Sequence, residues 1–355
     1  MKILITGICG FVGGSLARFW RETAPEWEIA GLDNFIRPGS EGNRLDLKKL
    51  GVKIFHGDIR AASDFETLPA ADFVVDAAAN ASVLAGVDGV TNSRQLVEHN
   101  LAGTLNLLEY CKRHRSGLVL LSTSRVYSIP PLAALPVRVE SGAYVPDAGR
   151  KLPEGLSAAG ITETFSTKAP VSLYGSTKLA SEAIALEYGE SFGFPVWIDR
   201  CGVLAGTGQF GRPDQGIFAY WLHSWKQGRP LKYIGFDGQG YQTRDVLHPH
   251  DLARLLRAQI EFTGSAKPRL VNVAGGAGQA MSLRQLSDWC ARRWGRREIS
   301  SDPQPRRFDL PWVVLDSTQA GTEWNWKPNI SADAILDEIA RHAEADPGWL
   351  ELSAP

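Results

Sequence analysis

The sequence has few cysteines, almost no net charge and no long hydrophobic run. Its four cysteines show no paired spacing, which argues against a disulfide framework and favours reduced thiols: Cys9, Cys111, Cys201 and Cys290. The 38 Lys and Arg residues are balanced by 39 Asp and Glu residues, so the net charge is −1. This balance argues against broad electrostatic binding to nucleic acid or to an anionic membrane.

No apolar run is long enough to cross a bilayer, and the chain enters an apolar segment after one lysine, unlike a signal peptide. We therefore expect a soluble, cytoplasmic protein. The length of 355 residues allows one large or two modest domains, and the 44% hydrophobic content is typical of a globular protein. Tryptophan is abundant: eight of the 11 follow residue 220, which predicts a separate aromatic core in the C-terminal part.

A glycine-rich turn follows the first apolar run. The segment MKILITGICGFVGG predicts a strand over residues 2–6 and a turn over 7–13, followed by a helix over 15–21. We expect Gly7 to permit the tight turn, Gly10 to let the backbone approach a dinucleotide pyrophosphate, and Gly13 to let helix and strand pack closely. The N-terminus of the helix would then offer unpaired N–H groups to the phosphates.

Two acidic residues extend this nucleotide-binding pattern. Asp33 ends the second apolar run, 20 residues after Gly13, where an acid that binds the adenosine ribose is expected. An acid there would repel a 2′-phosphate, which favours NAD over NADP. Asp58 follows a third apolar run and is a candidate for the adenine end of the site, or equally for a simple turn residue.

Apolar runs alternate with helical patterns over the first 200 residues. This alternation predicts an α/β fold with a Rossmann doubly wound parallel sheet. The expected strands are 2–6, 28–32, 52–56, 73–77, 118–122, 196–200 and a return strand at 270–273. The expected helices include 96–114 and 174–192, and later 215–225, 250–262, 282–294 and 331–343.

The chain divides into an NAD-binding domain and a smaller C-terminal substrate-binding domain. We assign residues 1–200, with a return segment at about 243–275, to the first, and residues 201–242 and 276–355 to the second. Residues 128–170 contain six prolines and little periodicity, which predicts a long insertion loop. Such a loop is often functional, and we favour a lid or an oligomer contact over a passive linker.

Tyr174 and Lys178 lie four residues apart at the start of a predicted helix, so both side chains share one face. A phenol with its ordinary pKa of about 10 is a poor base at neutral pH. A neighbouring lysine and an oxidised nicotinamide would favour the phenolate, so we expect Tyr174 to take the hydroxyl proton of an alcohol. The hydroxyls of Ser122, Thr123 and Ser124 are candidates to polarise the reacting oxygen.

Together these motifs resemble those of the extended short-chain dehydrogenases/reductases of the nucleotide-sugar epimerase type, over nearly the whole chain. The shared motifs are the glycine turn at 7–13, Asp33-Asn34, GDIR at 57–60, Asn100 with Gly103-Thr104, and YGSTK at 174–178. In that family the catalytic hydroxyl lies four residues before the Tyr of a Val-Tyr pair, which implies Thr123. The resemblance implies bound NAD and these cofactor contacts: Gly7, Gly10, Phe11, Val12, Gly13, Asp33, Asn34, Asp58, Ile59, Ala77, Ala78, Ala79, Asn100, Ser122, Tyr174 and Lys178.

The resemblance also implies a nucleotide-diphosphate sugar as substrate. RDVLH at 244–248 resembles the segment whose Arg reaches the diphosphate, and RRFD at 306–309 the segment that holds phosphate and ribose. The implied substrate contacts are Thr123, Ser124, Arg125, Tyr174, Arg200, Gln209, Gln215, Arg244, Arg306 and Asp309. Segments 100–109, 202–216 and 242–248 are most similar to members that act at carbon 2 of a CDP-hexose.

The two residues after Thr123 argue against two of the family's reactions, dehydration and decarboxylation. The family's dehydratases carry an Asp-Glu pair there and its decarboxylases a Glu at the second position, whereas this chain has Ser124 and Arg125. We therefore expect hydride removal and return through a transient keto-sugar, on a CDP-hexose or, alternatively, at carbon 4 of a UDP-sugar. An NAD-binding redox sensor without turnover is the alternative of another class.

Further expectations concern residues that differ from those of the relatives, metal binding and oligomeric state. Asp76 stands where many relatives have His, so it either adjusts the nicotinamide pocket or caps a turn, and Arg125 faces either substrate or solvent. His248 and His250 have no Cys or acid cluster beside them in the sequence, so we expect no metal site. Relatives dimerise through two helices per subunit that match 96–114 and 174–192, which implies a homodimer or homotetramer.

Overall fold

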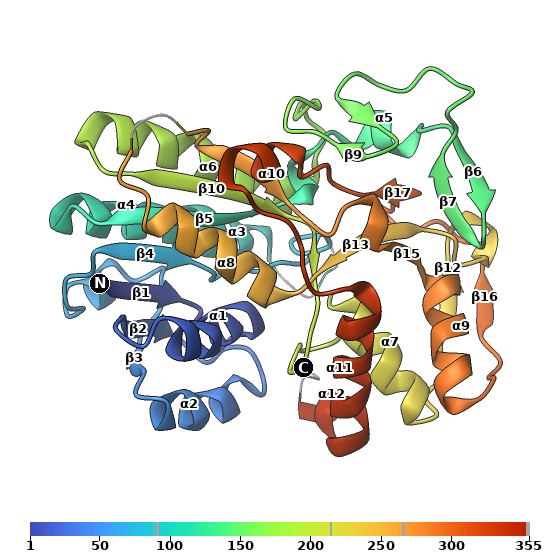
Figure 1. Cartoon of the computed structure of the whole chain (residues 1–355), viewed down its shortest axis with the longest axis horizontal. Helices are drawn as coiled ribbons and strands as arrows, with labels where there is room; N and C mark the ends of the chain where they lie inside the picture. The colour runs from blue at the N-terminus through green and yellow to red at the C-terminus, as the bar shows by residue number, and fades with distance from the viewer. Residues whose placement is uncertain (88, 90–91, 214, 265–266, 353–355) are drawn as a thin grey trace.

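A computed structural model describes residues 1–87, 89, 92–213, 215–264 and 267–352 (Figure 1). Its centre is a seven-stranded sheet in which every neighbouring pair is parallel. In spatial order the strands are β3 (Lys53–His56), β2 (Glu28–Asp33), β1 (Lys2–Thr6), β4 (Phe73–Asp76), β5 (Gly117–Thr123), β10 (Val196–Cys201) and β14 (Leu270–Val273). All seven predicted strands are confirmed, with boundaries that move by one residue at most.

The strand order reverses beside β1. The chain runs outward from β1 to β2 and β3, and then returns to the other side of β1 as β4. Open α/β sheets bind ligands at such a switch point, outside the carboxyl ends of the strands. Here Gly7 follows β1 and Ala77 to Ala79 follow β4, so the predicted nucleotide turn lies at this point.

Helices cover both faces of the central sheet (Figure 1). Alternating strand residues explain this: Ile3 and Ile5 of β1 face one hydrophobic cluster, while Leu4 faces the other. The first cluster lies under α1 (Phe11–Thr23), α2 (Ser40–Lys49), α8 (Pro249–Ile260) and α10 (Thr318–Trp324). The second lies under η1 (Ala62–Phe65), α4 (Gly103–His114) and α6 (Ser172–Phe192).

One predicted helix is interrupted. The expected helix over 96–114 consists of α3 (Ser93–Val97), a π-helical turn η2 (Glu98–Ala102) and then α4. Widened turns of this kind occur often at functional sites, and this one contains Asn100.

A smaller domain lies beside the C-terminal end of the central sheet, to the right in Figure 1. Its helices are α7 (Ile217–Lys226), α9 (Leu283–Trp294), α11 (Ala332–Ala345) and α12 (Trp349–Leu352), with short turns η4 (Phe236–Gly238) and η5 (Ala277–Gln279). Its strands are β11 (Val203–Leu204), β13 (Thr243–Leu247), β15 (Ala280–Ser282) and β17 (Trp312–Val313), and the pair β12 (Lys232–Ile234) and β16 (Ser300–Asp302). Within residues 243–275, β13 therefore pairs in the small sheet and only α8 and β14 return to the central one.

The expected aromatic core is present in this domain, but it contains only some of the tryptophans that follow residue 220. Trp221 of α7 stacks on Tyr233, with ring centroids 5.6 Å apart, inside a cluster shared with α9 and α11. Trp324 instead packs edge-on against Trp197 of the central sheet. The segment around α10 thus crosses back to cover the nucleotide domain.

The prediction that residues 128–170 form a long loop is wrong. They form α5 (Ile129–Ala133), the hairpin β6 (Val137–Glu140) and β7 (Ala143–Pro146), and a second hairpin of β8 (Leu156–Ser157) and β9 (Gly160–Ile161). Their apolar side chains share a core with β17, and the Tyr144 N–H donates to Tyr241 O at 2.8 Å. Because these partners lie far away in sequence, local periodicity did not reveal this structure.

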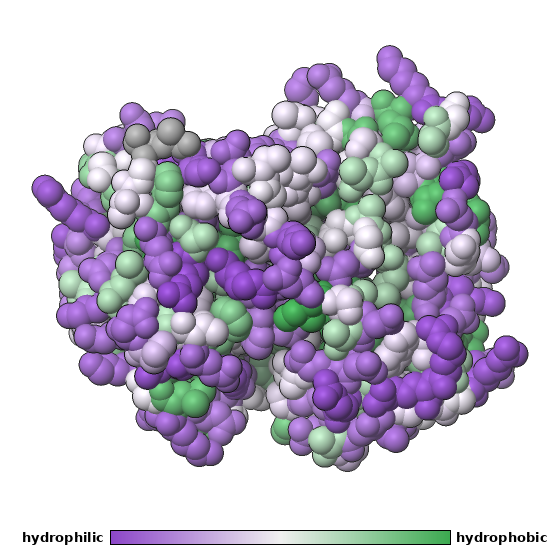
Figure 2. Space-filling view, viewed as in Figure 1, coloured by the Kyte–Doolittle hydropathy of each residue, from purple (hydrophilic) through white to green (hydrophobic). Residues whose placement is uncertain are grey.

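Hydrophilic side chains dominate the face of the molecule in Figure 2, and apolar ones form small separate groups. Over the described ranges, no helix combines the length and apolar character needed to cross a membrane.

Candidate active site

The glycine turn has the close packing that a dinucleotide site requires. Gly7 has φ +65°, and a Cβ on it would lie 3.0 Å from the Cα of Ala78. A Cβ on Gly13 would lie 2.4 Å from the carbonyl O of Gly7, which confirms that the helix needs glycine to pack on the strand. Gly10 is the N-cap of α1, so Phe11 and Val12 open the helix toward the turn. Only glycine allows the backbone to pack this closely, as in the turns that hold a dinucleotide pyrophosphate, so these residues fit NAD.

Asp33 lies at the end of β2 and is tied to the glycine turn. Its carboxylate accepts hydrogen bonds from Cys9 N at 2.8 Å and from Phe35 N at 2.8 Å. Burial raises the pKa of Asp33, and these two N–H donors oppose the rise. The predicted ribose-binding acid is thus held in one orientation beside the turn.

Asn34 and Asp58 meet at the carboxyl edge of the sheet, in a pocket that Ile36, His56 and Arg60 also line. Asn34 Nδ2 donates to Asp58 Oδ2 at 2.9 Å, and Arg60 pairs with the same carboxylate at 2.6 Å. The Arg60 guanidinium therefore holds the pKa of Asp58 well below its usual range. The Ile59 side chain packs on Gly103 in the core, which leaves its main chain for any cofactor contact.

Asp76, at the end of β4, binds inside the protein. Its carboxylate accepts from Thr6 Oγ1 at 2.7 Å and from Thr104 Oγ1 at 3.5 Å, and only 2% of the residue is exposed. Asp76 therefore links β1, β4 and α4 beneath the cofactor turn. The next residues, Ala77 to Ala79, are small, and the Ala78 N–H donates to Thr6 Oγ1 at 3.3 Å.

The structure brings Thr123, Tyr174 and Lys178 together where β5 ends and α6 begins. Tyr174 hydrogen-bonds to Thr123, and Lys178 is 2% exposed on the same helix. Asn100 holds this helix, because its side chain donates to Thr177 Oγ1 at 3.2 Å and its carbonyl accepts from Ser181 Oγ at 3.0 Å. The predicted catalytic residues are thus assembled from two distant segments.

The electrostatics of Tyr174 differ from the prediction that lysine lowers its pKa. Burial raises the pKa of Tyr174 to about 12. The Thr123 hydrogen bond and the Arg125 charge oppose this rise, and Cys201 adds to it. Among the protein groups, the desolvation of the phenol therefore outweighs its favourable neighbours.

Two predicted ligand contacts, Ser122 and Arg200, are instead bound to Glu182. Ser122 Oγ donates to Glu182 Oε1, and Arg200 Nη2 donates to Glu182 Oε2 at 2.7 Å. All three side chains are buried, and Arg200 also donates to the Tyr127 hydroxyl at 3.4 Å. A buried charge must be paired, so Arg200 is committed to Glu182 and is not a substrate contact. Glu182 was missed, although it lies on the face of Tyr174 and Lys178, four residues further along.

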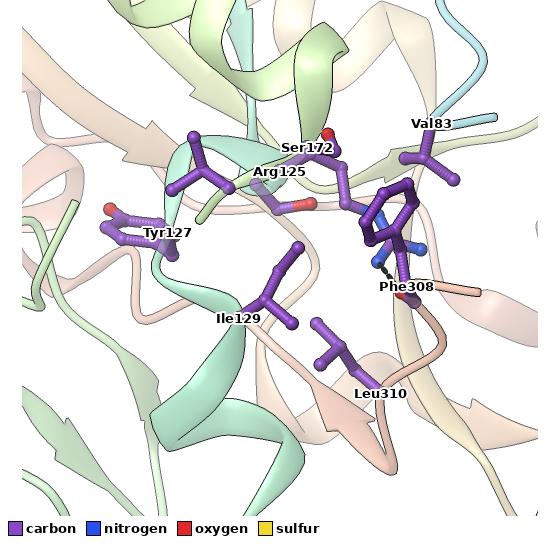
Figure 3. Close-up of a pocket in the computed structure, with 9 residues that line it drawn as sticks. Val83, Arg125, Tyr127, Ile129, Ser172, Phe308 and Leu310 are labelled. Atoms are coloured by element: carbon purple, nitrogen blue, oxygen red, sulfur yellow. Dashed lines mark hydrogen bonds between the residues drawn. The ribbon is translucent and has the colours of Figure 1, made fainter. Parts of the chain in front are cut away.

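Ser124 and Arg125 line a small pocket (Figure 3). Arg125 extends across this pocket to Phe308, where its Nη1 donates to the carbonyl O at 3.3 Å. The sequence motifs include two of the remaining lining residues, Tyr127 of the Val-Tyr pair and Phe308 of the RRFD segment. The others were not singled out from the sequence: Val83, Ile129, Val171, Ser172 and Leu310. Phe308 has φ +62°, in the left-handed region that non-glycine residues seldom adopt.

The predicted phosphate and ribose contacts lie beyond this pocket. Arg244 Nη2 pairs with Asp309 Oδ1 at 3.1 Å and donates to Leu310 O at 2.9 Å. Arg306 is exposed, and its Nη1 donates to Pro213 O at 3.4 Å. Arg244 of β13 is thus paired with Asp309, which lies three residues after the exposed Arg306.

Gln209 is bonded within the smaller domain, whereas Gln215 is bonded across the domain junction. Gln209 Nε2 donates to Leu204 O at 2.7 Å, while Gln215 Oε1 accepts from Arg37 Nη1 at 3.0 Å. Arg37 follows the predicted ribose-binding segment, so Gln215 links the smaller domain to the nucleotide domain. Asp214, between these two residues in the segment similar to the CDP-hexose enzymes, lies outside the described residues.

The two histidines of the His-Pro-His segment are structural. His248 caps α8 by accepting from the His250 N–H at 3.1 Å, and its Nε2 lies 3.0 Å from Glu338 Oε2. Within the part of the chain that the structure describes, no three His, Cys, Asp or Glu side chains form a group that could hold a metal ion.

The sequence and the fold match known proteins along most of the chain. Residues 3–274 match the model of the NAD dependent epimerase/dehydratase family. CDP-paratose 2-epimerase of Salmonella typhi is 28% identical, over 94% of this chain and 96% of that protein. UDP-glucuronate 4-epimerase of Thermodesulfobacterium geofontis is 26% identical, over 94% of this chain and 93% of the other.

Solved structures show the same architecture. UDP-glucose 4-epimerase of Thermus thermophilus, in complex with NAD, has a TM-score of 0.76 and 26% identity, covering 97% of this chain and 99% of that one. UDP-glucuronic acid 4-epimerase of Bacillus cereus, in complex with UDP-glucuronic acid and NAD, has a TM-score of 0.77 and 24% identity, with the same coverage. The chain therefore belongs to the NAD-dependent epimerase/dehydratase family, as an NAD-dependent enzyme of the epimerase type.

Proposed function

We propose that the protein epimerises carbon 2 of a CDP-hexose through a transient keto-sugar. The observation that carries this proposal is the Tyr174–Thr123 hydrogen bond, with Lys178 one turn further along the same helix and no carboxylate at positions 124 and 125. Dehydration requires a group that removes a proton from carbon, and the dehydratases supply it at these two positions. Ser124 and Arg125 offer no such base, whereas epimerisation by hydride removal and return requires only the phenol and its neighbours.

In the proposed reaction, the Tyr174 phenolate accepts the proton of the sugar hydroxyl while Thr123 donates a hydrogen bond to the same oxygen. Bound NAD would supply the acceptor, and then the donor, of the hydride of the sugar carbon. The keto-sugar would turn its other face before the hydride returns to that carbon, and Tyr174 then gives the proton back to the sugar oxygen. Proton and hydride are both returned, so the reaction needs no further reductant.

The glycine turn and Asp33 support tight retention of NAD, as this cycle requires, and the acid disfavours a 2′-phosphate. Arg244, Arg306 and Asp309 are the groups we assign to the diphosphate and ribose of the substrate. The CDP-hexose assignment is supported by the similarity to CDP-paratose 2-epimerase over 94% of the chain. The UDP-glucuronate 4-epimerases have nearly the same identity, so inversion at carbon 4 of a UDP-sugar is the second candidate.

Proton NMR in D₂O, without added cofactor, tests the proposal with CDP-glucose and then UDP-glucose. A manno product from the CDP-sugar, free of ring deuterium, is the expected result, because a hydride recycled on bound NAD never exchanges with solvent. A galacto product from the UDP-sugar would move the assignment to carbon 4. Ring deuterium would contradict hydride transfer and the argument from Ser124 and Arg125.

A negative result also has a defined meaning. Turnover of CDP-paratose but of neither glucose derivative would assign a deoxy-sugar substrate. Failure with all three sugars, with NAD still bound, would contradict the proposed substrate class and favour a redox sensor without turnover.

A further inference from the structure

Arg125 is built into the catalytic corner by its backbone. Its N–H donates to Thr123 Oγ1 at 3.2 Å, the hydroxyl that also bonds to Tyr174. Its carbonyl O faces Gly175, where a Cβ would lie only 2.3 Å away. The backbone of residue 125 therefore packs directly on the first turn of α6. Its N–H contact with Thr123 and its carbonyl contact with Gly175 fix its position relative to Tyr174.

The side chain of Arg125 lies in a largely apolar environment. It crosses the pocket in Figure 3 and donates to Phe308 O, among the side chains of Val83, Ile129 and Leu310. A guanidinium has five N–H donors, and this one bond to a neutral carbonyl leaves its charge without a paired carboxylate among the described residues. A charge in such a place acts strongly on its neighbours because little water screens it.

The charged and titratable groups that face this corner come from several elements. Asp309, on the segment before β17, attracts Arg125, but it is already paired with Arg244 of β13, which repels Arg125. The Arg125 charge lowers the pKa of Tyr174 of α6, and Tyr174 in turn raises the pKa of Arg125. Cys201 of β10 raises the pKa of Tyr174. Burial lowers the pKa of Arg125 to about 10, as expected for a charge that is only partly compensated.

We propose that Arg125 is a positioning residue for the reacting phenol, and that its guanidinium favours the phenolate of Tyr174. It acts together with Lys178, which lies one turn further along α6. The step is a proton transfer only: the O–H bond of the substrate breaks, Tyr174 takes the proton, and Arg125 keeps all of its own. The proposal rests on Tyr174 as the base of the proposed function and is independent of the sugar and the nucleotide.

The test is a tyrosinate titration of the NAD-loaded protein without sugar. The ultraviolet difference between the wild type and Tyr174→Phe isolates the titration of this one phenol. The same difference is then measured in the backgrounds of Arg125→Gln, which removes the charge, and Arg125→Lys, which keeps it. If Arg125→Gln does not fold, Arg125→Met removes the charge with a side chain of similar length.

We expect the midpoint of Tyr174 to rise by about one to three pH units in Arg125→Gln, as for the loss of a nearby opposite charge. Arg125→Lys should remain nearer the wild type, and Arg138→Gln, at an exposed arginine of β6, should leave the midpoint unchanged. Equal midpoints in the wild type and both Arg125 variants would overturn the proposal.

The pH profile of kcat gives a second readout once a substrate is known. Its acidic limb should move upward in Arg125→Gln, and kcat at neutral pH should fall about tenfold for each pH unit that the limb moves. A fall in kcat with an unmoved limb would show that Arg125 is merely structural. Because the titration contains no sugar, an incorrect substrate assignment does not affect its outcome.

Discussion

At the scale of single residues, the site depends on Tyr174, a phenol whose ionisation is disfavoured by burial. Tyr174 is 6% exposed, and burial raises its pKa to about 12. A useful base at neutral pH therefore needs a nearby positive charge, and the Arg125 guanidinium acts on this phenol in that sense.

Tyr174→Phe tests the role of this phenol. The variant should fold and retain NAD, because its ring fills the same space and the cofactor turn is untouched. We expect kcat to fall about 100-fold or more, the usual loss for a general acid–base group. Turnover is measured by NMR and bound NAD by its absorbance after denaturation. Turnover at the wild-type level would show that another group is the base.

Asp199 is a buried carboxylate away from the reaction. It is fully buried on β10, its Oδ1 accepts from Gln259 Nε2 at 2.8 Å, and its Oδ2 has no partner among the described residues. Burial raises the pKa of Asp199 from 3.8 to about 7. Between these values the folded protein binds more protons than the unfolded chain, so this residue's contribution to stability falls as the pH rises.

Asp199→Asn should remove this pH dependence, since the amide keeps the Gln259 bond and carries no charge. We expect the variant to gain about 1 kcal/mol or more over the wild type in unfolding free energy at about pH 8, and little at about pH 4. Urea unfolding at both pH values measures the difference. The same gain at both would refute the assignment of the slope to Asp199.

At the scale of elements, the contact between β1 and α1 determines the cofactor turn. Gly13 and Gly42 are both helical glycines, but a Cβ on Gly13 would meet Gly7 O at 2.4 Å, whereas one on Gly42 would meet nothing within 4 Å. The same substitution should therefore have opposite effects at the two sites.

Gly13→Ala should destabilise the protein by about 1–3 kcal/mol and reduce its NAD content, because the helix must move away from the turn. Gly42→Ala should stabilise the protein by about 0.5–1 kcal/mol, the usual gain in an exposed helix. Thermal unfolding and the NAD content of both variants decide the matter. Equal changes in stability for the two variants would mean that the backbone around Gly13 accommodates a Cβ without losing stability.

At the scale of the whole molecule, two neighbouring helices carry exposed apolar side chains. Leu105 of α4 is 42% exposed, and Leu173 and Phe192 of α6 are 40% and 45% exposed. The two helices pack against one face of the central sheet, away from the smaller domain (Figure 1). Together with the family resemblance, this surface supports the proposal of a homodimer.

Leu105→Glu should therefore convert the dimer to a monomer, because pairing would bury an unpaired charge. Leu45→Glu is the matched control: Leu45 is 65% exposed on α2, on the other face of the sheet. Sedimentation of the wild type and both variants gives the assembly state. A monomeric wild type would disprove the proposed dimer, and an unchanged Leu105→Glu would place its interface elsewhere.

The sequence by itself determined the parts that depend on local pattern. Apolar runs with helical patterns between them predicted the seven central strands, and glycine spacing predicted the turn whose packing tolerates no Cβ at Gly13. The spacing of Tyr174 and Lys178 placed both on one helix face. Each of these features depends on residues that lie close together in the sequence, so the local sequence is enough to predict it.

Only the tertiary structure decided which distant groups meet. Ser122 and Arg200 look like ligand contacts in sequence, but packing of β5, β10 and α6 turns both toward Glu182 and buries all three side chains. Residues 128–170 form two local hairpins, but their apolar side chains are buried against those of β17, far away in sequence. Arg125 could face substrate or solvent from its sequence alone. Its bond to Phe308, 183 residues later, holds it in the small pocket of Figure 3, because burial and pairing of charge are properties of the assembled fold.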